Sequence, residues 1–219
     1  MKGFEKWDKH KVGDVIWINK HKYHPHRQHF IDYVMANDSI VSVLEIGGGE
    51  LIEARKLIKQ KDKIKYTIAD ISASFLRNAK KTKGITCARA SMHELPFEDK
   101  QFDLVYLSSV IEHSPDIKKT IKEICRVSKN YYITMFKWKM KSGDLISQYR
   151  EKKKYYSTLF NLPSIMGLLK KHSHIEDINI SLASNSDTVS YKRYKKDVIG
   201  DVDKWRNGDR LNIIGSCNN

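Results

Sequence analysis

Apolar residues follow two alternating spacings along residues 26–138. Short runs rich in β-branched residues predict buried strands, and segments whose apolar residues recur every three or four positions predict helices. The expected strands cover residues 39–46, 65–71, 85–90, 102–109 and 131–138. The expected helices cover residues 26–36, 50–60, 72–81 and 117–128, the third of them with Ser72 as its N-cap.

Strands that alternate with helices predict an α/β fold with a doubly wound, Rossmann-like, mostly parallel sheet and helices on both faces. A chain of 219 residues suits one domain and is long enough to bury a large core. We therefore expect a single domain in which residues 39–138 form the central α/β unit. Residues 1–38 would precede this unit and residues 139–219 would follow it.

The composition adds a formal net charge of +14, carried mostly by lysines that are spread along the whole chain. Short basic clusters occur at residues 152–154 and 191–196. A lysine-rich surface of this kind is usually just solvated, and nucleic-acid binding is the alternative.

The chain carries no sequence signal for export or for membrane insertion. Its first residues lack the apolar segment of a secretory signal, and no run approaches the roughly 18 apolar residues of a membrane span. Cys87, Cys125 and Cys217 are far apart and lack the spacing of a zinc or redox site. We therefore expect reduced thiols and a cytoplasmic protein with no membrane span.

Three glycines follow the first expected strand in the segment VLEIGGGELI, residues 43–52. A triphosphate-binding loop needs a lysine that this segment lacks, and a dinucleotide fingerprint needs a glycine where Ile52 stands. Glu45, two positions before the glycines, would repel a pyrophosphate and suits a cationic ligand. Asp70, at the end of the next strand, suits a ribose whose two hydroxyls donate to one carboxylate. S-adenosylmethionine meets both requirements; alternatively, the glycines form only a tight connection and Asp70 only caps the next helix.

Four ordered blocks over residues 41–135 resemble the class I S-adenosylmethionine-dependent methyltransferases of the methyltransferase type 11 group. The blocks read VLEIGGGE, YTIADIS, ARASMHELPFEDKQFDLVYLSSVIEHSPD and YYITMFKW. The third block is the most specific, because LPF, an acidic turn, FDLV, EH and PD follow one another as in the family. The resemblance implies a seven-strand sheet with an antiparallel last strand. The candidates for its sixth and seventh strands are residues 175–182 and 210–217.

The resemblance also implies which residues bind S-adenosylmethionine. Gly47, Gly48 and Gly49 would let the backbone approach the methionine part of the cofactor, which Glu45 would face. Asp70 would hold the ribose. Ile71 would lie beside the adenine. Ser91 and Met92 would flank the adenine and Ser108 would lie under the methionine end, unless these three are ordinary loop and strand-end residues.

His113 follows Glu112 just beyond the fourth expected strand, at the edge where open α/β sheets bind ligands. A histidine there is suited to take a proton from an alcohol or amine acceptor, so His113 is the candidate catalytic base. The alternative is that His113 packs under the next helix or orients Glu112. A related group of small-RNA 2′-O-methyltransferases binds a metal through Glu-x-x-Glu-His on this loop. Ser109 replaces the first Glu of that motif here, so we expect no metal.

Four histidines lie between residues 21 and 29, just ahead of the first expected helix. They lack the cysteine partners or the distant second ligand pair of a zinc site, so they do not indicate a metal. Together with Trp7 and Trp17, this segment is expected to cap the cofactor pocket or the acceptor entrance, or simply to pack against the sheet.

These observations predict a methyltransferase that modifies oxygen or nitrogen of a small-molecule or glycan-precursor acceptor. A loop and a helix from residues 139–172 are expected to cover the acceptor site, and aromatic and basic residues within 190–209 could stack on the acceptor or grip it. One alternative is an RNA methyltransferase that uses the basic surface. The other is a non-catalytic S-adenosylmethionine-binding protein, since Leu51 and Ser91 stand where the family often has Gly and Asp. The sequence indicates no oligomeric state.

Overall fold

The computed structural model describes Trp7 and residues 25–136, 138–139, 146–150, 155–181, 191–193 and 210–218. The first five strands are β1 (Ser42–Ile46), β2 (Lys65–Asp70), β3 (Ile85–Arg89), β4 (Phe102–Ser108) and β5 (Ser128–Met135). The helices among them are α3 (Pro25–Met35), α4 (Ile52–Gln60), α5 (Ala73–Ala79) and α6 (Ile117–Val127). Each element lies where the hydrophobic pattern predicts it. Ser72 caps α5 as predicted, because its hydroxyl accepts the N–H of Phe75 at 3.4 Å.

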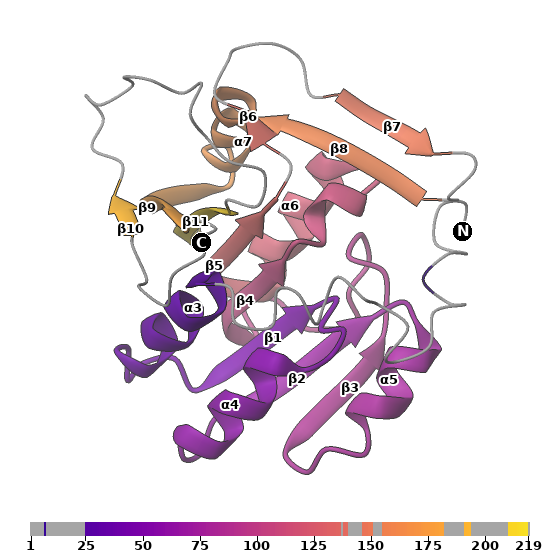
Figure 1. Cartoon of the computed structure of the whole chain (residues 1–219), viewed down its shortest axis with the longest axis vertical. Helices are drawn as coiled ribbons and strands as arrows, with labels where there is room; N and C mark the ends of the chain where they lie inside the picture. The colour runs from indigo at the N-terminus through magenta and orange to yellow at the C-terminus, as the bar shows by residue number, and fades with distance from the viewer. Residues whose placement is uncertain are drawn as a thin grey trace.

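The main sheet has eight strands in the order β10-β9-β11-β5-β4-β1-β2-β3 (Figure 1). Strands β1 to β5 pair with one another in parallel. By contrast, β11 (Arg210–Cys217) is antiparallel to both β5 and β9 (Ser173–Ser181). The predicted sixth and seventh strands and the mostly parallel, Rossmann-like fold are therefore confirmed. The sequence did not predict the short edge strand β10 (Tyr191–Arg193).

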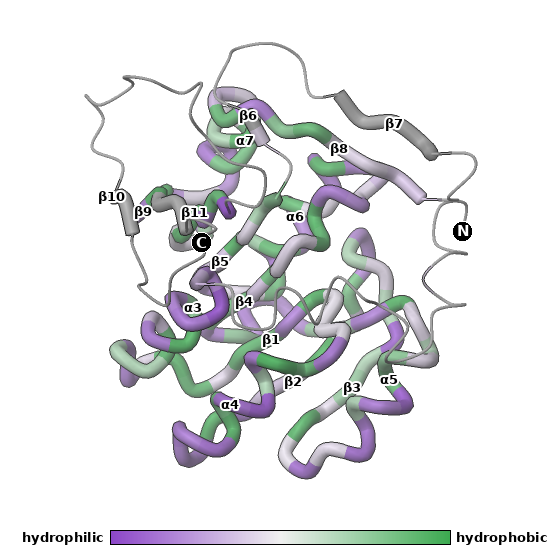
Figure 2. The backbone as a smooth tube through the Cα atoms, viewed as in Figure 1, coloured by the Kyte–Doolittle hydropathy of each residue, from purple (hydrophilic) through white to green (hydrophobic). Residues whose placement is uncertain are grey.

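Helices cover both faces of this sheet, which explains why its central strands are apolar throughout. Along β4, Leu104 and Tyr106 pack under α3, α4 and α5, whereas Val105 and Leu107 pack under α6 and α7 (Leu162–Leu169). This alternation follows from the opposite directions of successive side chains in a strand. Figure 2 shows hydrophobic and hydrophilic colour alternating around α4, as expected for a helix with one buried side.

A second, three-stranded sheet lies beyond β5 and corrects one prediction. Its order is β6-β8-β7, with β6 (Trp138–Lys139), β7 (Ile146–Arg150) and β8 (Tyr155–Asn161). The helix expected within residues 139–172 is present as α7, but much of the expected loop is the antiparallel pair β7 and β8. The aromatic and β-branched run YYSTLF in β8 favours a strand, and its pairing with β6 and β7 is a contact that local spacing does not encode.

A buried ionic group joins α3 to α4 and the sheet. Nη1 of Arg27 donates to Oε1 of Glu53 at 2.5 Å, and the hydroxyl of Tyr106 donates to the same oxygen at 3.0 Å. The Glu53 side chain is 1% exposed, and the Tyr106 ring stacks on Phe30 with centroids 3.6 Å apart. Removing one charge of such a pair leaves the other buried and uncompensated.

Arg27→Met is therefore expected to lower the free energy of unfolding by about 3–5 kcal/mol. Urea denaturation measures this loss. The double variant Arg27→Met with Glu53→Gln should recover most of it, because no buried charge remains. A single variant that unfolds at the same urea concentration as the original protein would contradict this account of how α3 is held.

Candidate active site

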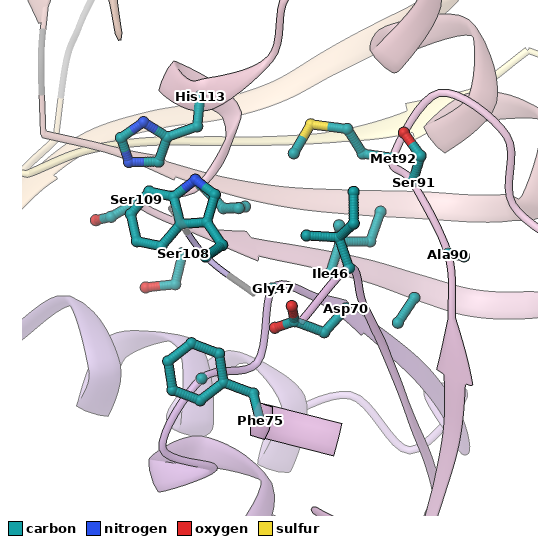
Figure 3. Close-up of a pocket in the computed structure, with 15 residues that line it drawn as sticks. Ile46, Gly47, Asp70, Phe75, Ala90, Ser91, Met92, Ser108, Ser109 and His113 are labelled. Atoms are coloured by element: carbon teal, nitrogen blue, oxygen red, sulfur yellow. The ribbon is translucent and has the colours of Figure 1, made fainter. Parts of the chain in front are cut away.

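A cavity opens at the carboxyl edge of the main sheet, beyond the ends of β1, β2 and β4. Figure 3 shows His113 on one side of it, Ser91 and Met92 on another, and the Asp70 carboxylate directed into it. Most of the residues predicted from the sequence line this cavity: Gly47, Gly49, Asp70, Ile71, Ser91, Met92, Ser108 and His113. The other two, Glu45 and Gly48, line an adjoining cavity that shares Gly47, Gly49 and Ser108 with the first.

The glycine turn after β1 has a backbone conformation that glycine adopts most easily. Gly47 (φ 73°) and Gly49 (φ 47°) lie in the left-handed region. A Cβ atom on Gly47 would lie 2.6 Å from Cγ2 of Val110, so a larger residue does not fit between this turn and the loop after β4. Leu51 is also left-handed (φ 61°), and its buried side chain packs in the core. The turn therefore lets a ligand come close to the backbone.

Asp70 ends β2 with a carboxylate that is held by backbone groups. It accepts the N–H of Ser72 at 2.8 Å, and the N–H groups of Gly49 and Ile71 also interact with it. Burial raises the pKa of Asp70 to about 6, while these N–H groups act in the opposite direction. Since Ser72 is the N-cap of α5, Asp70 is not needed for that purpose.

Apolar side chains make up much of the lining of the first cavity. Met92 is 7% exposed, and both Ile71 and Phe75 also line the cavity. Ser91 is nearly buried, and its hydroxyl accepts the N–H of His93 at 3.2 Å. Apolar side chains around a cavity suit an aromatic group such as adenine.

The adjoining cavity contains ionisable groups of both signs: His26, Arg27, Glu45, Glu50, Glu53 and Arg210. Burial, and then the Glu53 carboxylate, raise the pKa of Glu45 well above its usual value. Oε2 of Glu45 accepts the Tyr66 hydroxyl at 2.9 Å. A cationic group entering this cavity would favour the ionised form of Glu45, while Arg210 and His26 suit an anionic group. The cavity therefore fits a zwitterion such as an α-amino acid.

His113 ends a short 3-10 helix, η1 (Ile111–His113), that follows β4. Its Nδ1 lies 2.9 Å from the carbonyl oxygen of Tyr156 on β8. A carbonyl only accepts, so Nδ1 carries a proton and the neutral ring has its lone pair on Nε2. Ser109, between β4 and η1, has the left-handed φ of 56°, which turns the chain sharply at this edge. The hydrogen bond to Tyr156 fixes the tautomer of the neutral ring, and both predicted roles of His113 stay predictions.

Aromatic rings surround His113. The ring centroids of Trp7, Tyr155 and Phe136 lie 4.8, 5.1 and 6.2 Å from that of His113. Trp7 lines the cavity, whereas Trp17 lies outside the described residues. The capping by the N-terminal segment stays a prediction. The guanidinium of Arg210 lies 5.5 Å from the centre of the Phe136 ring.

The histidines near α3 have separate partners. Nε2 of His26 lies 3.3 Å from Oγ of Ser108, and Nδ1 of His29 contacts the hydroxyl of Tyr132. His21 and His24 lie outside the described residues. Within the part of the chain that the structure describes, no group of three or more His, Cys, Asp or Glu side chains could hold a metal ion.

The three cysteines are free thiols. Among the described helices, none is long and apolar enough to cross a membrane.

Comparison with known proteins finds a matching domain family and similar proteins. Residues 44–131 match the methyltransferase domain of type 11. This match confirms the predicted class I S-adenosylmethionine-dependent methyltransferase domain of type 11. Its match to the ubiquinone/menaquinone biosynthesis C-methyltransferase UbiE of Rickettsia rickettsii (strain Sheila Smith) is 29% identical over 177 residues and covers 75% of this chain. The chain spans 64% of the length of that relative.

Solved structures share the fold at low sequence identity. A methyltransferase in complex with the Trm112 methyltransferase activator of Haloferax volcanii has a TM-score of 0.72 at 16% identity, with 99% of this chain and 96% of that chain covered. The 1,6-didemethyltoxoflavin-N1-methyltransferase of Burkholderia thailandensis, solved with S-adenosylhomocysteine, has a TM-score of 0.65 at 13% identity, with 94% and 83% covered. S-adenosylmethionine is the methyl donor in this family, as predicted.

Several residues that line the site were missed from the sequence. Phe75, Tyr155 and Phe136 surround the cavity or His113, and Arg27 and Arg210 reach the adjoining cavity. The position of Phe75 in the first turn after Asp70 was a usable signal. The others come from distant segments, and their types alone indicated only core or surface positions.

Proposed function

We propose that this chain transfers the methyl group of S-adenosylmethionine to oxygen or nitrogen of a small-molecule acceptor, including glycan precursors. The observation that carries the proposal is that Asp70 and His113, from strands on either side of β1, line one cavity beside the glycine turn. The Asp70 carboxylate suits the hydroxyls of a ribose, and the His113 imidazole suits the proton that the acceptor must lose. The proposal treats residues 1–38 as a cap, 39–138 as the cofactor-binding core and 139–219 as the acceptor side.

The cofactor would lie across both cavities. Asp70 would accept the ribose hydroxyls, while Ile71, Ser91 and Met92 would enclose the adenine. The backbone of Gly47, Gly48 and Gly49 would follow the methionine part, with Glu45 facing its cationic groups and Ser108 beneath it. The crowded turn at Gly47 and the mixed charges of the adjoining cavity support this orientation.

The chemistry requires a base and a dry site. The cofactor supplies an electrophilic methyl group bound to a positively charged sulfur. Nε2 of His113 would take the proton of the acceptor O–H or N–H, because Nδ1 already donates to Tyr156. Trp7 and Tyr155, which pack around His113, would exclude water and align the acceptor.

The methyl-accepting atom is tested directly by incubating the protein with S-adenosylmethionine labelled in its methyl carbon and with pools of small molecules, glycan precursors and RNA. The carbon NMR shift of the product separates methyl on oxygen, nitrogen and carbon. Labelled O- or N-methyl small molecules are expected. A C-methyl product would place the chain with the activity named for its Rickettsia relative. Labelled RNA would support the RNA methyltransferase alternative, and cofactor binding without any labelled product would support a non-catalytic protein.

Arg210 is expected to bind the carboxylate of the methionine part. Arg210→Gln should therefore weaken binding of S-adenosylhomocysteine by about tenfold or more, since charged hydrogen bonds contribute about 1.5–3 kcal/mol. Binding of 5′-methylthioadenosine, which lacks the amino-acid group, serves as the control and should change little. Calorimetry measures both affinities. Equal losses for the two ligands would refute the carboxylate assignment.

A further inference from the structure

A basic groove lies at the amino edge of the main sheet, away from the candidate active site. It is formed by the end of α4, the connection into β2 and the connection from α5 into β3 (Figure 1). Its cationic side chains are Arg55, Lys59, Lys61, Lys63, Lys81 and Lys83. Asp62 is the one acidic residue that lines it. The groove therefore gathers a substantial part of the positive charge of the chain in one place.

Helix stability explains only some of these lysines. Nζ of Lys61 donates to the carbonyl oxygens of Val34 and Asn37, both at 2.7 Å, and so closes the end of α3. Lys59 lies in the last turn of α4, where the helix dipole favours a cation. Lys63 and Lys83 lie in the connections beyond the helices, where neither effect applies.

The remaining charges are not neutralised within the described part of the chain. Arg55, Lys59, Lys63, Lys81 and Lys83 are exposed, and none forms an ion pair with another described residue. Like charges held together repel one another, and an approaching polyanion relieves this repulsion and releases its own counterions. A groove of this kind has an electrostatic preference for a multiply charged anion.

We propose that this groove binds the sugar–phosphate backbone of a nucleic-acid strand without reading its sequence. The site is hollowed, which suits a narrow chain better than a flat lipid surface. No aromatic residue lines it, so base stacking is absent and phosphate contacts provide the affinity. The lack of exposed aromatic groups likewise removes the usual anchors for a membrane interface.

This binding would hold the protein on a nucleic acid without presenting a base for methylation. The groove is at the start of β2 and β3, whereas the cavity lined by Asp70 and His113 is at the opposite edge of the same parallel strands. The inference therefore does not depend on the proposed acceptor, and it gives the basic surface a role separate from catalysis.

Fluorescence anisotropy with labelled single-stranded RNA and DNA of about 12 nucleotides tests the proposal at several salt concentrations. Five phosphate contacts predict a slope of log K against log salt near −3.5, since each contributes about 0.7 on single strands. The triple variant Lys59→Glu, Lys63→Glu, Lys83→Glu should weaken binding at least tenfold and reduce the slope by about 2. Lys61 is left intact because it caps α3.

The matched control is the triple variant Lys118→Glu, Lys119→Glu, Lys122→Glu on the exposed side of α6. It changes the net charge equally but lies outside the groove, so its affinity should stay within about threefold of the original protein. Equal weakening by both triple variants would overturn the proposal in favour of diffuse charge. Stronger binding to phosphatidylserine vesicles than to either nucleic acid would also overturn it. Unchanged S-adenosylhomocysteine binding in both variants verifies that they are folded.

Discussion

Replacing His113 by alanine is expected to lower the single-turnover rate of methyl transfer about 10²–10⁴-fold, the usual contribution of a positioned base. Binding of S-adenosylhomocysteine should change by only a few-fold, because the residues proposed to hold adenosine lie around Asp70 and Met92. The reason is that Nδ1 of His113 is committed to the Tyr156 carbonyl, which leaves Nε2 to accept the acceptor proton. The interaction is therefore made in the transition state and not in the cofactor complex.

A purely structural histidine would behave differently. His93 is the matched control, because it is half-buried, bonds to Ser114 at 2.8 Å and does not line the cavity. His93→Ala should lower the melting temperature while the transfer rate of the folded protein is retained. A His113→Ala protein with full rate and normal stability would exclude the base role and leave the methyltransferase assignment intact.

Replacing Asp70 by asparagine or alanine is expected to weaken cofactor binding by at least about tenfold. Two hydroxyl groups of the ribose would donate to this carboxylate, and each charged hydrogen bond contributes about 1.5–3 kcal/mol against about 1.4 kcal/mol per decade of affinity. Calorimetry with S-adenosylhomocysteine measures the loss. An unchanged dissociation constant in both variants would refute the ribose assignment.

The same carboxylate should make cofactor binding depend on pH. Burial raises the pKa of Asp70 to about 6, and the ribose binds to the ionised form. The affinity should therefore be complete above about pH 7 and should fall as pH decreases through 6, approaching tenfold per pH unit. Asp70→Asn cannot ionise and should lose this dependence. A wild-type affinity that is constant between about pH 5 and 8 would contradict the assignment.

The stability of the cofactor-free protein should depend on pH in the opposite direction. The folded-state pKa of Asp70, about 6, lies above the model-compound value of 3.8, so the folded protein binds the proton more tightly than the unfolded chain. Stability is then lost as pH rises through this interval, because a buried carboxylate must ionise. Asp70→Asn should consequently raise the melting temperature of the cofactor-free protein at pH 7 and change it little near pH 4. A residue whose replacement weakens binding yet raises stability serves the ligand and not the fold.

The sequence by itself determined the order of strands and helices from α3 to β5, and it placed the glycine turn and Asp70 at one edge of the sheet. Burial on both faces makes each central strand apolar along a short run, and burial on one side gives each helix its three-to-four spacing; both signals are local. The glycine turn and Asp70 were also predictable. Parallel strands end at the same edge of a sheet, so residues that follow β1 and β2 must meet there.

The surroundings of His113 and of the adjoining cavity were decided by contacts between distant segments. His113 and Tyr156 are 43 positions apart, and His26 and Ser108 are 82 apart. The packing of β8 against η1 brings the Tyr156 carbonyl to His113, and the antiparallel placement of β11 between β5 and β9 brings Arg210 to Phe136. Such contacts depend on how the elements pack together in space. The residues next to a given residue in the sequence determine whether it is buried and whether it lies in a strand or a helix. Only the packed sheet determines which side chains face each other across the cavity.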